Sequence, residues 1–425
     1  MLSNKNFILY FFTTILFFEF MLFFHIDIGG VQIKLVRFLQ VFFIIYFIYF
    51  FFFKFRKENF SKIIYCKIDL FFTIFITYLF LNALFYYFIN DDLLILKLSL
   101  FEISKFVFYY FIYLYLIRFF YKNINLFLLH KLLYFFLYFI IVLGLTELAS
   151  NFFLSYNLIP RQLNYGINDA NIGLRFHSIL GEPRDAAVNL LIIFSLIIFL
   201  ELLLYKKLKS YFILFLTLLS AILTMSTTLV FAIVIILIFY LVLNKNYINN
   251  ILIIFVGYLI LFIVFNLNQR VLGYISDIFL LPIALNDIND LKNLNLEPQL
   301  INIMPIYLFL MDLINLNLIE FVFGHGVKSS SIISYLAFDN FGANPHSQLS
   351  RLVYDVGLVG LLAYIFLLNF YKENILKMNM DNKNMILILF IICLSASLAH
   401  RTGTFFIFLS LTHLIYIKSI HDLSN

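Results

Sequence analysis

Tryptophan is absent from the 425-residue chain, cysteine occurs twice, and charged residues make up only 12% of it. Hydrophobic residues account for 64%. Soluble domains carry about 25% charged residues, so a chain with this little charge cannot build a water-facing surface. The composition therefore excludes a soluble globular enzyme and predicts a protein that uses lipid as its solvent.

Other absences narrow the chemistry. Cys66 and Cys393 fall in a predicted cytoplasmic loop and inside a predicted membrane span, which excludes a disulfide and a zinc site built on them. The few histidines do not form a metal-binding pattern. The sequence also has no DxD motif and no Gly-rich phosphate-binding loop, so a nucleotide-linked substrate and a nucleic-acid partner are not expected.

Apolar runs dominate what is present. Each run is about 16 to 23 residues long, enough to cross a hydrocarbon core of roughly 30 Å as a helix. The predicted fold class is an all-α polytopic integral membrane protein with about 12 transmembrane helices. The predicted spans are 7–25, 38–53, 70–89, 104–120, 131–148, 186–204, 211–225, 227–243, 250–267, 352–371, 384–399 and 403–417.

Basic residues orient these spans. With both termini in the cytoplasm, every predicted cytoplasmic segment carries lysine or arginine, as the positive-inside rule requires. Within a single transmembrane domain, 1–425, this leaves two long periplasmic loops, 149–185 and 268–351. Long loops among short ones usually carry function. Helical pieces are expected in the second loop around 271–281 and 303–319.

Arginine is distributed against that rule. Only Arg56 and Arg118 are predicted inside, whereas seven lie on the outer face: Arg37, Arg161, Arg175, Arg184, Arg270, Arg351 and Arg401. The planar guanidinium binds phosphate or carboxylate in a bidentate manner, so the set predicts an anion site outside. The alternative is that these arginines pair with outer acids or reach lipid phosphates. Arg37 and Arg401 sit at helix ends, where charge is costly and often functional.

The second long loop carries the most specific motifs. It contains Gly324-His325-Gly326 and ends at His346-Ser347, and after nine more residues the next span holds Gly357-Leu358-Val359-Gly360. The first long loop closes with RFHSILGEPRDAA. In these motifs and in its topology the chain resembles the O-antigen polymerase and O-antigen ligase families of bacterial envelope glycosyltransferases. Glycines 357 and 360 are expected to permit close helix packing.

The resemblance implies a GT-C-like, multi-pass enzyme of the bacterial inner membrane. Its donor would be a glycan on undecaprenyl diphosphate, and its acceptor a hydroxyl of another glycan or of lipid A-core. The implied reaction needs no metal and no cofactor. The resemblance further implies two kinds of partner, namely the surrounding membrane lipid and a protein that regulates chain length.

The same resemblance assigns the candidate residues. Arg175, Arg184 and Arg270 are expected to bind the diphosphate, with Arg37 and Arg401 supporting them. His346 and Glu182 compete as the base that takes the acceptor proton.

Structural alternatives stay open for several of these residues. His346 follows Pro345 and would stand at a helix N-terminus, so it could serve only as a cap. Glu182 could pair with an arginine. Arg351 and Asp355, four residues apart, could form an ordinary helical pair. The weaker histidine candidates are His177, His325 and His400.

A polymerase of lipid-linked repeat units is the leading hypothesis, and a ligase that moves finished glycan onto lipid A-core or protein is its closest rival. A lipid-linked oligosaccharide flippase or another transporter is more remote, because carriers commonly show repeats and broken helices that the sequence does not display. A third hypothesis, a non-catalytic scaffold of the cell envelope, does not explain why arginines gather on the outer face.

Overall fold

A computed structural model describes most of the apolar segments of the chain. The described residues are 10, 13–15, 19, 25–28, 31–53, 67–90, 93–116, 118, 124–154, 158, 176, 178, 183–209, 211–224, 258, 303–338, 348–378, 383–396 and 403–423. Within them, four helices are long and apolar enough to cross a membrane: Lys67–Ile89, Leu126–Leu154, Ala186–Tyr205 and Leu349–Lys377. The predicted class of helical, membrane-embedded protein is confirmed at this level.

Nine predicted spans coincide with helices. These are α2 (Leu35–Phe53), α3 (Lys67–Asn90), α4 (Leu93–Tyr109), α5 (Leu126–Leu154), α6 (Pro183–Tyr205), α7 (Tyr211–Leu223), α15 (Gln348–Lys377), α16 (Lys383–Ala396) and α17 (Gly403–Leu423). Apolar length alone was enough to locate them. The predicted spans 227–243 and 250–267 lie outside the described residues except for Tyr258, and the first span is described at only a few positions.

The helix that contains the fourth predicted span is longer than that span. The span was predicted at 104–120, whereas α4 begins at Leu93. Glu102 is in fact buried, and its carboxylate is paired with Lys105 and Lys328. The helix then passes into a π-helix, η3 (Tyr110–Leu116), which continues the same span.

A short β-hairpin precedes α2 and was not predicted. Strands β1 (His25–Ile28) and β2 (Val31–Lys34) pair antiparallel, with His25 opposite Lys34 and Ile28 opposite Val31. The intervening sequence is Gly29-Gly30, the residue type that a tight hairpin connection favours. Because β2 leads directly into α2, the hairpin defines where α2 starts and places Arg37 in its first turn.

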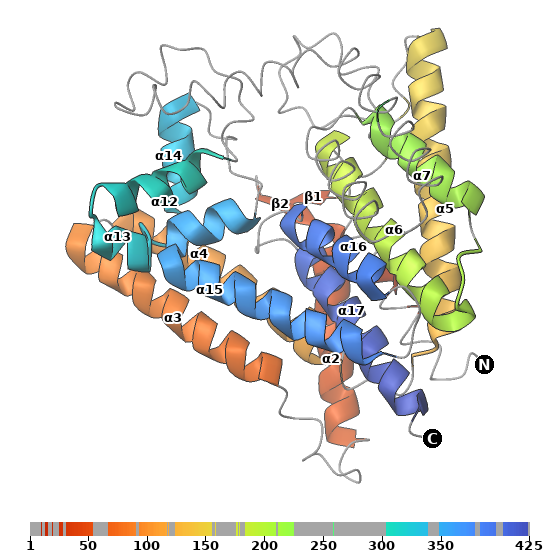
Figure 1. Cartoon of the computed structure of the whole chain (residues 1–425), viewed down its shortest axis with the longest axis horizontal. Helices are drawn as coiled ribbons and strands as arrows, with labels where there is room; N and C mark the ends of the chain where they lie inside the picture. The colour runs from red at the N-terminus through yellow and green to blue at the C-terminus, as the bar shows by residue number, and fades with distance from the viewer. Residues whose placement is uncertain are drawn as a thin grey trace.

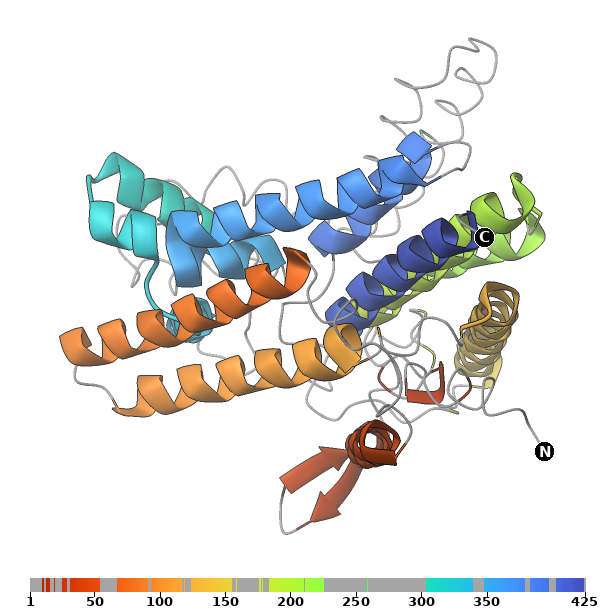
Figure 2. The same cartoon turned by 90° about the horizontal axis from the view of Figure 1, so that it is seen from below.

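The helices form two groups joined through α15 and α17. In both cartoon views α3 and α15 lie side by side, and α12 (Met304–Ile314), α13 (Leu318–Phe323) and α14 (Ser329–Phe338) gather at one end of them (Figures 1 and 2). On the other side α5, α7 and α16 contact α6, whose apolar stretch is 89% buried. The corresponding stretch of α3 is only 39% buried, so α3 presents an apolar outer face.

Candidate functional site

Most of the predicted site residues lie outside the residues that the structure describes. These are His346, Glu182, Arg175, Arg270 and Arg401. The backbone of Arg184 is in the first turn of α6, but its side chain is not described. Arg37 is described in full. The functional roles of all seven residues therefore stay predictions.

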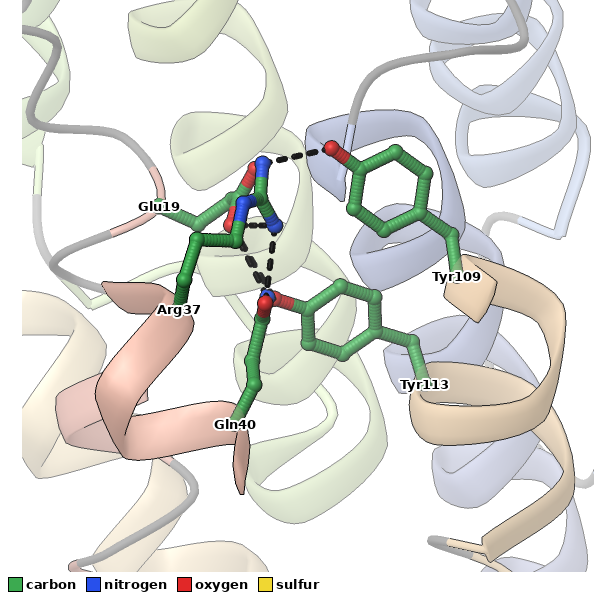
Figure 3. A network of polar contacts seen from close by, with 5 residues as sticks. All are labelled: Glu19, Arg37, Gln40, Tyr109 and Tyr113. Carbon is green, nitrogen blue, oxygen red and sulfur yellow. Dashed lines mark hydrogen bonds and ion pairs between the residues drawn. The ribbon is translucent and has the colours of Figure 1, made fainter. Parts of the chain in front are cut away.

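Arg37 lies in a polar network that ties α2 to α4 (Figure 3). Its Nη1 donates to Gln40 Oε1 at 2.8 Å and contacts Glu19 Oε2 at 3.5 Å, and its Nη2 donates to the Tyr109 hydroxyl at 2.6 Å. The Arg37 side chain keeps 29% of its surface exposed. Arg37 is thus a partly exposed cation held in place by mostly neutral acceptors.

Glu19 is the buried partner in this network. Its side chain is 2% exposed, and its Oε2 also accepts from Gln40 Nε2 at 3.2 Å and from the Tyr113 hydroxyl at 3.1 Å. Arg37, Gln40 and Tyr113 thus converge on one oxygen of Glu19. Sequence reasoning missed Glu19, although a lone acid in an apolar run is a functional suspect by default.

The Gly324-His325-Gly326 turn packs against a break in α15. At Gly357 the backbone leaves the helical conformation, with φ 66° and ψ −150°. His325 N donates to Tyr354 O at 2.9 Å and Gly326 N donates to Asp355 O at 3.1 Å. The turn therefore supplies donors to carbonyls just before the break, which an interrupted helix leaves without their usual partners.

Glycine is required on both sides of this contact. Gly324 has φ 80° and Gly326 has φ 96°, conformations that other residues rarely adopt. A side chain at Gly357 would collide with the backbone of Gly324 and Val322. Two motifs that the sequence presents separately, Gly-x-Gly and Gly-x-x-Gly, thus form one structural unit.

Asp355 organises the residues that follow the turn. Its carboxylate, with the residue 3% exposed, accepts from Lys328 N at 3.1 Å, Ser329 Oγ at 3.1 Å and Ser330 N at 2.7 Å. It therefore caps the N-terminus of α14 from another helix. Arg351, four residues earlier on α15, also attracts this carboxylate, so the contacts with the loop add to the predicted helical pair.

His325 and Asp312 form a close pair at this turn. His325 Nε2 lies 2.7 Å from Asp312 Oδ2, and the imidazole stacks on the Tyr354 ring with centroids 4.3 Å apart. The side chain of Asp312 is 10% exposed and that of His325 is 27% exposed. In the tautomer whose Nε2 donates to the Asp312 carboxylate, Nδ1 is left as a hydrogen-bond acceptor. A carboxylate that orients an imidazole in this way suits it to accept a proton.

Two lysines lie around a buried carboxylate beside this pair. Glu102 Oε1 lies 3.4 Å from Lys328 Nζ and 3.6 Å from Lys105 Nζ, so two ammonium groups share one carboxylate. Ser99 Oγ donates to Val327 O at 2.7 Å and holds the segment against α4.

The structure brings together His325, which sequence reasoning ranked as a weaker candidate, and Asp312, which it did not consider. The available signal was Asp312 as a single acid inside the apolar segment MPIYLFLMDLI. Comparisons of the chain with protein-family models, with curated proteins and with solved structures found no match.

Proposed function

We propose that the chain is a glycosyltransferase that joins lipid-linked repeat units into a polysaccharide at the outer face of the bacterial inner membrane. In this proposal the chain has about twelve spans, a GT-C-like arrangement and cytoplasmic termini. The observation that carries it is the contact between the Gly-x-Gly turn and the Gly-x-x-Gly segment. Both belong to the family resemblance, and their contact holds His325 against Asp312.

The proposed reaction moves a glycan from undecaprenyl diphosphate to an acceptor hydroxyl. The acceptor oxygen forms a bond to the anomeric carbon, and the bond from that carbon to the diphosphate oxygen breaks. Undecaprenyl diphosphate leaves with the bonding electron pair, and the hydroxyl proton passes to a base. His325 joins His346 and Glu182 as a candidate for that base, because Asp312 fixes the orientation of its ring.

Cationic groups are proposed to stabilise the departing diphosphate. Arg175, Arg184 and Arg270 keep that role as predictions, with Arg37 and Arg401 in support. Among the described residues, Lys105 and Lys328 around Glu102 supply positive charge beside the turn. Fixed donors aimed at developing negative charge are usually the largest single contribution to such catalysis.

A transporter is the second candidate, and the break of α15 at Gly357 favours it. Interrupted helices often form the substrate sites of carriers. The sequence was expected to lack such a break, and that expectation was wrong because a glycine within an apolar run does not reveal its backbone conformation.

Gene deletion separates these functions. Loss of a polymerase leaves single repeats attached to core, loss of a ligase leaves long chains on undecaprenyl diphosphate, and loss of a flippase leaves no lipid-linked glycan at the outer face.

The purified protein, reconstituted with an undecaprenyl-diphosphate-linked repeat unit, tests the assignment of His325. The wild type is expected to form polymer, and His325→Ala is expected to slow it about 10²- to 10⁴-fold, the usual contribution of a general base. Asp312→Asn should slow it less, because the imidazole remains. Asn315→Ala, at the exposed end of α12, is the matched control. Unchanged rates in both variants would remove His325 from the mechanism, and no product from the wild type with any lipid-linked acceptor would reject the polymerase.

A further inference from the structure

The α12–α13 hairpin belongs to a segment, 268–351, that the topology places outside the membrane. In the structure it does not project away from the spans. It packs against one end of α3 and α15, as Figure 1 shows. Its position relative to the membrane can be read from these two helices.

Contacts with α3 give the depth of the hairpin. Asn82 Nδ2 donates to Phe323 O at 2.8 Å, and the Tyr86 hydroxyl donates to Gly324 O. The apolar stretch of α3 ends at Ile89, so Asn82 lies about 10 Å below that end at 1.5 Å per residue. The stretch is 23 residues long, or about 35 Å, and exceeds a core of about 30 Å by only a few ångström at each end.

Contacts with α15 give the same result independently. The predicted span within α15 begins at 352, after Arg351, and the turn meets α15 at Gly357, about 8 Å further along the helix. Two antiparallel helices therefore place the end of α13 at a similar distance inside the hydrocarbon region.

The outer face of the hairpin is apolar. Seven large side chains between positions 310 and 323 are 44% to 76% exposed: Leu310, Leu313, Ile314, Leu316, Leu318, Ile319 and Phe323. The hairpin has two acids: Asp312 points inward to His325, and Glu320, which is partly buried, lies near Tyr86 of α3. In water so many adjacent apolar side chains would form an aggregation-prone patch.

This face continues the lipid-facing surface of α3. The Phe323 ring lies 6.5 Å from the Phe85 ring, which is itself 42% exposed, and the neighbouring Leu81 and Phe88 of α3 are also exposed. A helix that crosses the bilayer with this face uncovered must present it to acyl chains, and the hairpin extends the same surface.

The turn also meets the requirement for irregular backbone inside a membrane. Such backbone is tolerated where protein groups satisfy its hydrogen bonds. Gly324 N donates to Glu320 O at 2.7 Å, the amides of His325 and Gly326 donate to α15, and Asn82 and Tyr86 donate to the carbonyls of Phe323 and Gly324.

We infer that α12 and α13 form a re-entrant hairpin, inserted into the leaflet at the Asn90 end of α3, with its outer face against lipid acyl chains. The inner face holds the His325–Asp312 pair, so this pair lies beside lipid at membrane depth. The inference does not depend on the proposed glycosyltransferase activity.

The absence of native tryptophan makes a direct test available. Leu318→Trp and Ile314→Trp each create a single fluorophore on the outer face of the hairpin. Leu81→Trp on α3 is the lipid-exposed control, and Lys207→Trp in the exposed connection between α6 and α7 is the aqueous control. Each full-length variant is reconstituted in phosphatidylcholine vesicles with brominated acyl chains, and quenching is compared with that by acrylamide.

The inference expects both hairpin variants to match Leu81→Trp, with strong quenching by bromine, weak quenching by acrylamide and blue-shifted emission. Behaviour like that of Lys207→Trp would overturn it and place the hairpin in water. Protection from both quenchers would also overturn it, because a second protein surface would then cover the hairpin. Absence of bromine quenching in Leu81→Trp would remove the premise that α3 faces lipid.

Discussion

Two arginine–carboxylate pairs flank the same helical segment, α4 with η3, and they differ in almost every physical respect. Arg118 binds Asp69 in a bidentate manner, with Nη1 to Oδ2 at 2.7 Å and Nη2 to Oδ1, and the side chains are 5% and 9% exposed. Arg37 reaches Glu19 through one nitrogen at 3.5 Å and is 29% exposed. We call Arg118–Asp69 the closed pair, because both side chains are buried, and Arg37–Glu19 the open pair, because Arg37 is partly exposed.

The difference in geometry indicates which of the two arginines has room for another anion. The bidentate geometry and burial of Arg118 leave little room for another anion, and the Tyr110 hydroxyl also donates to Asp69 Oδ1, at 2.7 Å, so the pair ties η3 to α3. Arg37 is held mainly by neutral groups, Gln40 and Tyr109, which can remain in place when an anion replaces Glu19 as its counter-charge. Arg118 was predicted on the inner face and Arg37 on the outer face, and the anion-binding role of the outer arginines stays a prediction.

The largest expected effect comes from breaking the closed pair. Asp69→Asn leaves the Arg118 guanidinium buried without a counter-charge, which costs about 3–5 kcal/mol of stability. The midpoint of thermal unfolding in detergent should fall by several degrees. The midpoint is measured in a Cys66→Ser background with a thiol-reactive fluorophore, which labels the buried Cys393 only when the protein unfolds.

A double variant provides the control for that experiment. Asp69→Leu with Arg118→Met removes both charges, and apolar replacement of a buried pair is often neutral or stabilising. Its unfolding midpoint should lie close to that of the wild type. A single variant as stable as the wild type would show that the pair is not needed to hold η3 on α3.

The helices that carry these two pairs were predicted from the sequence, but the contacts between their side chains were not. The apolar run at 38–53 located α2 and the run at 70–89 located α3, because the length of an apolar segment is enough to predict a span. The pairing of Glu19 with Arg37 depends on how separate helices pack, which no local pattern contains. The β-hairpin before Arg37 was missed for a related reason, since His25–Ile28 is too short to separate from the end of an apolar run.

The glycine motifs show the same limit. Gly357 and Gly360 were predicted to permit close packing, and Gly357 does lie against Gly324. The mode of packing was beyond prediction, because the helix breaks at Gly357 only where the distant His325 and Gly326 amides are available as donors to its carbonyls.

An intermediate effect is expected from opening the Arg37 network further. Glu19→Gln preserves shape and hydrogen-bonding capacity but removes the negative charge next to Arg37. If Arg37 binds a diphosphate, its affinity for pyrophosphate should rise about tenfold at low salt, because two charges about 4 Å apart interact by a few kcal/mol near a protein surface before screening. Titration calorimetry in low and high salt measures the gain.

The matched control for this prediction adds Arg37→Gln to Glu19→Gln. The gain in pyrophosphate affinity should disappear in the double variant, which separates Arg37 from the other outer cations. Equal affinity in Glu19→Gln and the wild type would mean that Arg37 is as structural as Arg118, and the contrast between the open and closed pairs would no longer indicate function.

The smallest effect is expected at the neutral side of the open network. Tyr109→Phe removes the hydroxyl that accepts from Arg37 Nη2 but keeps the ring, whose centroid lies 5.1 Å from the guanidinium carbon. A hydrogen bond to a charged group contributes about 1.5–3 kcal/mol, and the partial exposure of Arg37 lets water replace part of it, so a loss of about 1 kcal/mol is expected.

Removing the Tyr110 hydroxyl from the closed pair by Tyr110→Phe is the parallel change and should cost more, because Asp69 is buried and water cannot substitute. Thermal unfolding of the two variants, followed through Cys393, compares them directly. Equal losses would show that exposure does not distinguish the two networks, whereas a smaller loss for Tyr109→Phe supports an Arg37 that can exchange its partners for an anion.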